Sequence, residues 1–389
     1  MADFRVVISG GGIVGLAAAH CFASRDCPTL LLDKPNATSS IGEFGADLRS
    51  VALAPVAVSF LEKLVGKPIP SSFIDSMHIW ERDGSAAITM AAAEVNEPHL
   101  ASVYENNELT AALRAKLPSQ VTVHESEGIS AMHGETHSIS VDGLGEVVPE
   151  LLVIAEGSRS RTCKTLNLSY QLDVNLDQRA IATIVETPKS HQNRALQLFG
   201  PTPLALLPLS NPRLRALIWS LPTDEAFNML NASKTAFLDK LNRATEHLVG
   251  TISDVDRRLS FPLSHQLLDD FNPQPNVIVL GDAAHTIHPL AGQGVNLGLE
   301  DVRAAHANLQ SMPTRLNKPG YWRSFNAKRK LRALAMLRLM SFFGNIYAVQ
   351  SPYLRLLRNA GVRWVNENSP LKRQLIREAM GIGPIANVL

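Results

Sequence analysis

The first 33 residues constrain the fold more than any other part of the sequence. A short apolar run leads into Gly10-x-Gly12-x-x-Gly15, and an alanine-rich helical segment follows. In a dinucleotide-binding turn the first glycine allows the tight bend, the second lets a pyrophosphate approach, and the third lets helix and strand pack closely. A second apolar run ends at Asp33, where a carboxylate takes the ribose hydroxyls of the dinucleotide. The sequence therefore predicts a βαβ unit that opens a parallel sheet and binds a dinucleotide.

A second motif lies in the last third of the chain. The apolar run 277–280 ends at Gly281-Asp282, and a turn rich in proline and glycine leads to a helix near Gly294. The free N–H groups and the positive dipole of a helix start favour negative charge. A nucleotide cofactor whose ring gains negative charge would suit both the carboxylate and this helix. The alternative is that Asp282 only caps a helix.

Composition restricts the classes of protein further. Hydrophobic residues make up 45% and charged residues 19% of the 389 residues, as in soluble globular proteins of two or three domains. The three cysteines have no metal-like or CxxC spacing, which favours a reducing cytoplasm. No run of about 18 uncharged apolar residues is present, so we expect no transmembrane helix. The first strand starts near residue 4, so we expect no signal peptide.

The net charge of +1 is unevenly distributed. Residues 321–389 hold 12 Lys or Arg and two acidic residues, a net charge of +10, so the preceding 320 residues sum to −9. The same tail carries the apolar block 334–343. Basic, apolar helices suit an anionic membrane surface or an acidic partner, and they also suit packing on the acidic part of the same chain. No nucleic-acid-binding motif accompanies the charge, so we expect no nucleic-acid partner.

The pattern of apolar residues predicts a nucleotide-binding domain that is interrupted twice. Strand and helix alternate near the N-terminus, a hairpin signal covers 77–90, and antiparallel strands are predicted over 171–264. The expected nucleotide-binding domain comprises 1–66, 98–170 and 265–325. The expected substrate domain comprises 67–97 and 171–264, and a helical segment covers 326–389.

Three motifs together resemble the flavin-dependent aromatic hydroxylases of the p-hydroxybenzoate hydroxylase type. They are the glycine turn, Glu156-Gly157 where that family has Asp-Gly, and Gly281-Asp282 with its following helix. The resemblance implies an α/β fold: an FAD-binding, Rossmann-like domain of the glutathione-reductase type, an inserted antiparallel-sheet substrate domain and a C-terminal helical segment. It also implies FAD as cofactor, with NAD(P)H or a protein electron donor as the reductant.

The resemblance carries over to individual positions. It implies that the side chain of Asp282 holds the ribityl chain and that the turn before Gly294 faces the flavin ring. The implied cofactor contacts are Gly10, Gly12, Gly15, Asp33, Arg49, Glu156, Gly157, Asp282, Gly292, Gln293, Gly294, Val295 and Asn296. Pro289 and His288 would lie beside the reacting edge of the flavin. His285 and His288 are three residues apart, but no third ligand is evident, so a metal site is not expected.

Within that family the chain is similar to the hydroxylases of ubiquinone biosynthesis. The segments 47–53, 103–106, 200–209, 351–361 and 370–373 follow their pattern. The implied reaction is hydroxylation of a polyprenyl phenol by O2 through a C4a-hydroperoxyflavin, in the cytoplasm or at the periphery of the inner membrane. Contact with the membrane or with a quinone-biosynthesis complex would use the basic tail.

Three positions depart from the family, and two alternative functions stay open. Glu156 replaces the usual Asp, Asp33 replaces the commoner Glu, and Asn107 stands where the ubiquinone group has Arg. The alternatives are a hydroxylase of a small soluble aromatic acid and a non-catalytic member of a quinone-biosynthesis complex.

Overall fold

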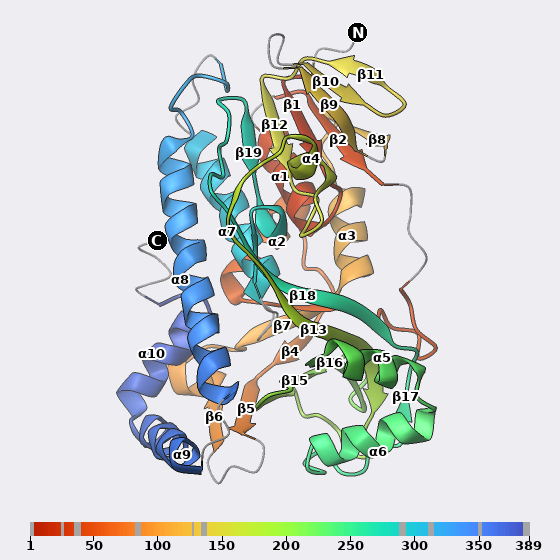
Figure 1. The fold of residues 1–389 in the computed structure, drawn as a ribbon, viewed down its shortest axis with the longest axis vertical. Coiled ribbons are helices and arrows are strands. Elements are labelled where there is room, and N and C mark those ends of the chain that lie inside the picture. The colour runs from red at the N-terminus through yellow and green to blue at the C-terminus, as the bar shows by residue number, and fades with distance from the viewer. Residues whose placement is uncertain are drawn as a thin grey trace.

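The fold is built around two sheets that lie at opposite ends of the molecule (Figure 1). This computed structural model describes residues 4–24, 27–34, 40–81, 87–126, 128–133, 138–287, 293–309, 315–348 and 352–383. The side chains of 293, 343–348, 352–358 and 362 lie outside that description. The mixed α/β architecture implied by the resemblance is confirmed.

The first sheet, here called the parallel sheet, has the order β19-β12-β1-β2-β8. Its strands are β1 (Val6–Ser9), β2 (Thr29–Asp33), β8 (Val121–Glu125), β12 (Leu151–Ile154) and β19 (Val277–Val279). All four neighbouring pairs are parallel, and β1, β12 and β19 are completely buried, as continuous apolar runs in parallel sheets are. Helix α1 (Ile13–Ala23) follows the glycine turn, so the predicted βαβ unit is confirmed. Because the strands are parallel, the motifs at their carboxyl ends meet at one edge.

The second sheet, here called the large sheet, has nine strands. Its main path is β20-β18-β13-β16-β15-β14-β5-β6, and β17 pairs with β13. The strands are β5 (Ser76–Glu81), β6 (Ala87–Ala91), β13 (Tyr170–Glu186), β14 (Arg194–Phe199), β15 (Leu204–Pro208), β16 (Leu214–Pro222), β17 (Asp254–Val255), β18 (Leu259–Leu268) and β20 (His285–Thr286). The predicted hairpin is confirmed, because β5 and β6 pair antiparallel. Neighbouring strands from 171–264 also pair antiparallel, whereas β14 joins β5 in parallel.

The two faces of the large sheet have different neighbours. Helices α5 (Thr223–Asn231) and α6 (Lys234–Ala244) cover one face, where Trp219 and Phe237 are fully buried. The opposite face packs partly against the segment around Leu48 and against helix α10 (Ser369–Ala379). Neither helix of the 171–264 segment was predicted, because apolar residues at helical spacing were not sought between strands.

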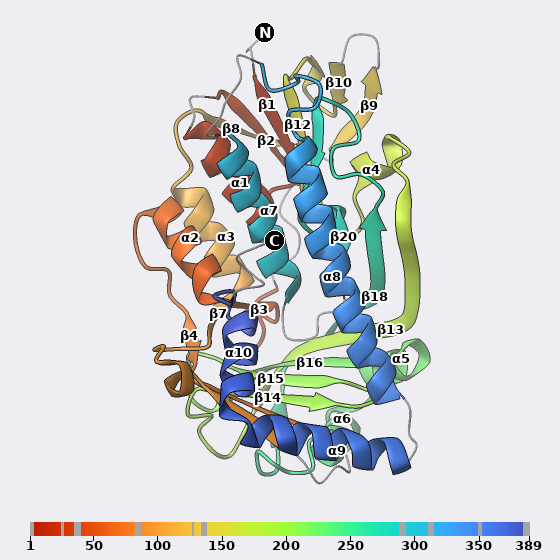
Figure 2. The same cartoon turned by 90° about the vertical axis from the view of Figure 1, so that its left-hand side faces the viewer.

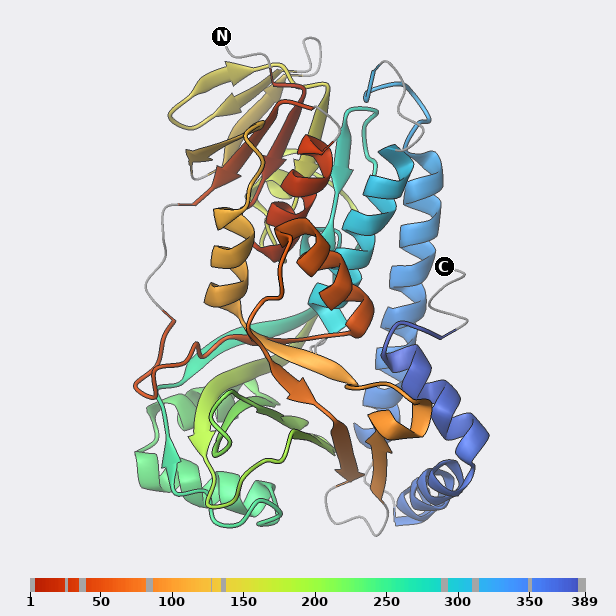
Figure 3. The ribbon, with the colours of Figure 1, turned by 180° about the vertical axis from the view of Figure 1, so that it is seen from behind.

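The structure also describes two smaller sheets, one between the two main sheets and the other at the outer end beside the parallel sheet (Figure 3). One small sheet has the order β3-β7-β4, and another, β11-β10-β9, is a third insertion that the sequence analysis did not predict. Their strands are β3 (Ser50–Leu53), β4 (Ser72–Ile74), β7 (Ala101–Glu105), β9 (Ile129–His133), β10 (Ser138–Val141) and β11 (Gly145–Val147). The remaining helices are α2 (Pro55–Val65), α3 (Asn106–Ala115), α4 (Arg161–Thr165), α7 (Gln293–Asn308), α8 (Arg323–Ala348), α9 (Pro352–Glu367), and the 3-10 turns η1 (Ala92–Val95) and η2 (Gly281–Ala283).

The C-terminal helices run along the outside of both sheets. Helix α8 extends from the parallel sheet to the level of the large sheet, α9 crosses beneath it, and α10 lies to one side of its lower half (Figure 2). No helix in the described part of the chain is long and apolar enough to cross a membrane. The predicted division into domains was read from sequence alone and stays a prediction.

Candidate cofactor site

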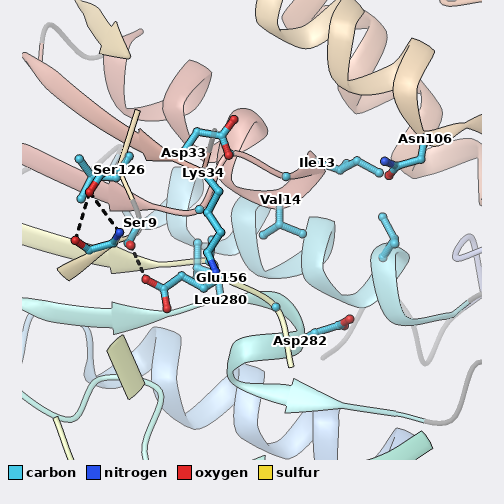
Figure 4. A pocket seen from close by; sticks show the side chains of 18 residues that line it. Ser9, Ile13, Val14, Asp33, Lys34, Asn106, Ser126, Glu156, Leu280 and Asp282 are labelled. Atoms are coloured by element: carbon cyan, nitrogen blue, oxygen red, sulfur yellow. Dashed lines mark hydrogen bonds between the residues drawn. The ribbon is translucent and has the colours of Figure 1, made fainter. Parts of the chain in front are cut away.

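A cavity of about 350 Å³ lies at the carboxyl edge of the parallel sheet (Figure 4). It brings together predicted site residues that lie far apart in the sequence. These are Gly10, Gly12, Asp33, Glu156, Gly157, Asp282 and Val295. Residues that the sequence analysis missed also line it: Ser9, Gly11, Ile13, Val14, Leu32, Lys34, Asn106, Ser126, Gly128, Ala155 and Leu280.

The glycine turn is shaped for a ligand that lies against the backbone. Gly10 has a φ of +113°, and a Cβ on Gly15 would lie 1.8 Å from the carbonyl oxygen of Gly10. A Cβ on Gly12, in contrast, would meet nothing within 4 Å. Gly12 is the N-cap of α1 and makes no side-chain hydrogen bond, and the first residues of the helix, Ile13 and Val14, line the cavity with it. This arrangement fits a pyrophosphate.

Asp33, the last residue of β2, lies against Gly11 of the glycine turn. Its carboxylate forms an ion pair with Arg114 of α3, and a Cβ on Gly11 would lie 2.1 Å from its Cγ. Gly11 is therefore needed for the approach of Asp33, a requirement that the fingerprint did not reveal. Contact of Asp33 with a ribose stays a prediction.

The Glu156 carboxylate is fully engaged by the protein. It accepts hydrogen bonds from the hydroxyls of Ser9, Ser160 (2.7 Å) and Thr162 (2.6 Å) and from the Thr162 backbone N–H (2.9 Å). Ser9 ends β1, and Ser160 and Thr162 belong to the start of α4. The extra methylene of Glu relative to Asp thus lets one side chain join two elements. Its predicted contact with the cofactor is not tested by these hydrogen bonds.

Asp282 is in the opposite situation. It lies in the turn η2 after β19, and its side chain lines the cavity. Within the part of the chain that the structure describes, its carboxylate accepts no hydrogen bond. Burial, with the nearby charge of Asp301, raises the pKa of Asp282 above its ordinary value. Asp282 is partly exposed, and its side chain lines the cavity, so this carboxylate without protein donors fits a ligand that brings hydroxyl donors, such as the ribityl chain of FAD.

The helix after Asp282 begins at Gln293, one residue before the predicted start. A Cβ on Gly294 would lie 3.3 Å from Oδ1 of Asp282, so the helix start and the carboxylate are neighbours. Val295 lines the cavity, whereas Asn296 ties α7 to the start of α2. Its side chain accepts from the Ala54 N–H and donates to the Ala52 carbonyl, both at 2.9 Å. His288, Pro289 and Gly292 lie outside the described residues.

Arg49 lies beside Asn107 and does not line this cavity. Its guanidinium donates to Ser40 at 3.0 Å and to Asn107 at 3.3 Å. The Asp47 carboxylate accepts hydrogen bonds from the backbone N–H groups of Arg49 and Asn107. Half of the Arg49 side chain is exposed. Arg49 therefore puts a positive charge next to the position where the ubiquinone group has Arg.

His285 is not part of a metal site within the described residues. No cluster of three metal-ligating side chains occurs among them. His285 instead contacts Asp301, at 2.6 Å from its Nε2. The sequence analysis missed Asp301 because its position in α7 follows no motif used there.

Comparison with known proteins agrees with this geometry. The ubiquinone hydroxylase UbiL of Rhodospirillum rubrum is 26% identical over 97% of this chain and 90% of its own length. The 3-demethoxyubiquinol 3-hydroxylase of Escherichia coli is 26% identical over 97% of this chain and 98% of its own length. The mouse mitochondrial ubiquinone biosynthesis monooxygenase COQ6 is 25% identical over 96% of this chain and 90% of its own length.

Solved structures share the fold along the whole chain. The p-nitrophenol 4-monooxygenase PnpA of Pseudomonas putida matches with a TM-score of 0.76 at 17% identity and covers 98% of this chain and 99% of its own. A Klebsiella pneumoniae HpxO variant complexed with FAD matches with a TM-score of 0.74 at 15% identity, over 98% and 100%. The family described as FAD binding domain matches residues 3–339, which is most of the sequence. The chain therefore belongs to this FAD-binding family, and its cofactor is FAD.

Proposed function

We propose that this protein is an FAD-dependent monooxygenase that hydroxylates the aromatic ring of a polyprenyl phenol in ubiquinone biosynthesis. The observation that carries this proposal is the convergence of the glycine turn and Asp282 in one cavity. Similarity over nearly the full length to ubiquinone hydroxylases supports the substrate class.

The protein's part in the reaction is to bind and orient. When bound, FAD would supply the redox chemistry that links a reductant, NAD(P)H or a protein electron donor, to the use of O2. Gly12 and the start of α1 would hold the pyrophosphate, and Asp282 would accept hydrogen bonds from the ribityl hydroxyls. The start of α7 near Gly294 would stabilise negative charge on the ring. Pro289 and His288 remain the proposed residues beside the reacting edge.

The large sheet supplies a surface suited to an aromatic ring. Gln197, Ala205, Ile218 and Ala182 are consecutive partners on four neighbouring strands and so share one face. This face lies away from α5 and α6, whose apolar partners are the alternate residues Leu196, Leu204, Leu217 and Ile181. Ala182 and Ala205 are small side chains on this face, and the Gln197 amide donates to two backbone carbonyls. We propose that the phenol ring binds between this face and the flavin.

The basic tail is proposed to bring the enzyme to its prenylated substrate. Part of its charge is used within the molecule: Arg329 and Arg332 pair with Glu300, and Lys372 pairs with Glu94. Large apolar side chains on α8 and α9 nevertheless face solvent, with Phe342 58% and Trp364 59% exposed. Exposed aromatic residues among basic ones favour an anionic membrane surface.

Reconstitution tests the proposed activity. The purified protein, loaded with FAD and supplied with NADH or NADPH, should convert a prenylated phenol to a product heavier by one oxygen atom, detected by mass spectrometry. It should also restore quinone synthesis in a hydroxylase-deficient cell. Turnover of small soluble aromatic acids alone would favour the soluble-substrate alternative. Complementation that survives Asp282→Asn without bound FAD would favour a non-catalytic role.

A further inference from the structure

A buried network lies directly behind the loop that carries Asp282. Asp301, on α7, accepts hydrogen bonds from the Gly281 N–H (2.9 Å), from Nε2 of His285 (2.6 Å) and from Nε of Arg329 (2.6 Å). The side chains of Asp301 and His285 are 0% exposed, and that of Arg329 is 4% exposed. Such burial makes every one of these contacts strong and its loss costly.

The neighbours of Asp301 favour its carboxylate form. Burial would raise the pKa of Asp301, but the charges of His285 and Arg329 and the hydrogen bonds from both side chains outweigh it and lower that pKa. Among the described residues, Nδ1 of His285 is buried without a hydrogen-bond partner, so the ring is held through Nε2 alone. The network is thus a buried carboxylate held by three donors.

The contacts bracket Asp282. Asp301 accepts hydrogen bonds from Gly281, the residue before Asp282, and from His285, three residues after Asp282. Gly281 has a φ of +63°, and helix α7 approaches so closely that a Cβ on Gly298 would lie 3.1 Å from the Gly281 Cα. The direction of the Asp282 side chain therefore depends on a loop that is fixed at both ends by one carboxylate.

Arg329 connects this loop to the C-terminal helix. It lies on α8, and besides Asp301 it donates to Glu300 (3.2 Å) and to the Leu297 carbonyl (3.3 Å) on α7. We propose that Asp301 is a positioning residue for FAD: with His285 and Arg329 it holds the Asp282 loop in its binding geometry, so that docking of α8 contributes to cofactor affinity. This inference rests on the proposed contact between Asp282 and FAD.

Paired substitutions at His285 test the proposal. His285→Leu removes the donor to Asp301, whereas His285→Gln keeps an N–H donor on a neutral side chain. FAD affinity, measured by quenching of flavin fluorescence, should fall about tenfold or more in His285→Leu and recover in His285→Gln. Asp301→Asn and Arg329→Met should weaken binding similarly. Asn242→Ala is the matched control, because Asn242 is a buried clamp of the Ile252 backbone in another part of the fold.

A double-mutant cycle separates this inference from the contact on which it rests. If the network acts through Asp282, His285→Leu should change FAD affinity little in an Asp282→Asn background. Asp282→Asn with unchanged affinity would overturn the proposed contact itself. Weak binding by Asp282→Asn, together with full affinity of His285→Leu, would overturn the inference alone. It would also be overturned if Asn242→Ala, at equal loss of thermal stability, weakened FAD binding as much.

Discussion

Two of the three carboxylates that line the cavity, Glu156 and Asp282, have very different surroundings. Glu156 receives four hydrogen bonds from β1 and α4, whereas Asp282 receives none from the described residues, and burial raises its pKa. The fold satisfies the first carboxylate, and we propose that the second accepts hydrogen bonds from a ligand. On this proposal the region near Glu156 contributes mainly to stability and the region near Asp282 mainly to binding.

The largest expected effect is a difference between Gly15 and Gly12, since one substitution should reduce stability and the other should reduce FAD binding. Gly15→Ala places a Cβ 1.8 Å from the Gly10 carbonyl oxygen, so it should lower the free energy of unfolding by about 3 kcal/mol. Gly12→Ala meets nothing within 4 Å and keeps an ordinary φ of −76°. It should change the free energy of unfolding by less than about 0.5 kcal/mol and still weaken FAD binding. Urea denaturation and FAD titration of both variants check this, and equal stability losses would contradict it.

Loss of the Glu156 carboxylate should mainly affect stability. Glu156→Gln cannot accept all four hydrogen bonds, so we expect a loss of about 2 kcal/mol in the free energy of unfolding of the FAD-free protein. Glu146→Gln is the control, because the Glu146 side chain is 66% exposed and its removal should cost almost nothing. Urea denaturation measures both. A Glu156→Gln protein as stable as the control would mean that these contacts add little.

Substitution of Asp282 should raise the free energy of unfolding rather than lower it, and the size of this change should depend on pH. Because its pKa is raised in the folded state, the folded protein binds more protons than the unfolded one between the two pKa values. The stability contributed by this group therefore falls as pH rises through that interval. Asp282→Asn should make the FAD-free protein more stable than the wild type at pH 8, and the difference should disappear below the ordinary Asp pKa of about 4. Thermal denaturation against pH would contradict this if the variant were less stable at pH 8.

The smallest expected effect is on the reactivity of Cys163, which lies on α4 and contacts the turn that carries Asp282. Its Sγ contacts the Ala283 carbonyl oxygen at 4.0 Å, and burial raises its pKa to about 11. Cys21 and Cys27 are also buried. Alkylation by iodoacetamide at pH 8 should therefore be negligible in the native protein, and all three thiols should react in urea. Rapid labelling of the native protein, followed by mass spectrometry, would show that this part of the fold opens.

The sequence was sufficient where function depends on backbone geometry. Gly10 and Gly281 have a positive φ, and a Cβ on Gly15 would collide with the Gly10 carbonyl, so the backbone itself requires glycine at these positions. Gly12 and Asp282 are recognisable by their spacing from these glycines, and the parallel strands that precede both motifs are apolar runs. The convergence of these segments followed from parallel strand order.

Side chains that act across the fold could not be predicted in this way. The ion pair of Asp301 with Arg329 joins two helices, and that of Asp33 with Arg114 joins a strand to a helix. No local sequence pattern indicates either contact. Similarly, Glu156 was seen as a departure from the family, and only the structure shows that its length lets it reach Ser9. The helices α5 and α6 were missed because their amphipathic pattern lies between strong strand signals.

We propose that Asp282 is positioned to bind FAD at the expense of stability. The most direct test is an FAD titration of the wild type and Asp282→Asn at pH 8, followed by flavin fluorescence, with the thermal stability of the same FAD-free samples. We predict affinity weaker by about 10- to 100-fold in a variant whose FAD-free form is the more stable. Unchanged FAD affinity in Asp282→Asn would contradict the claim.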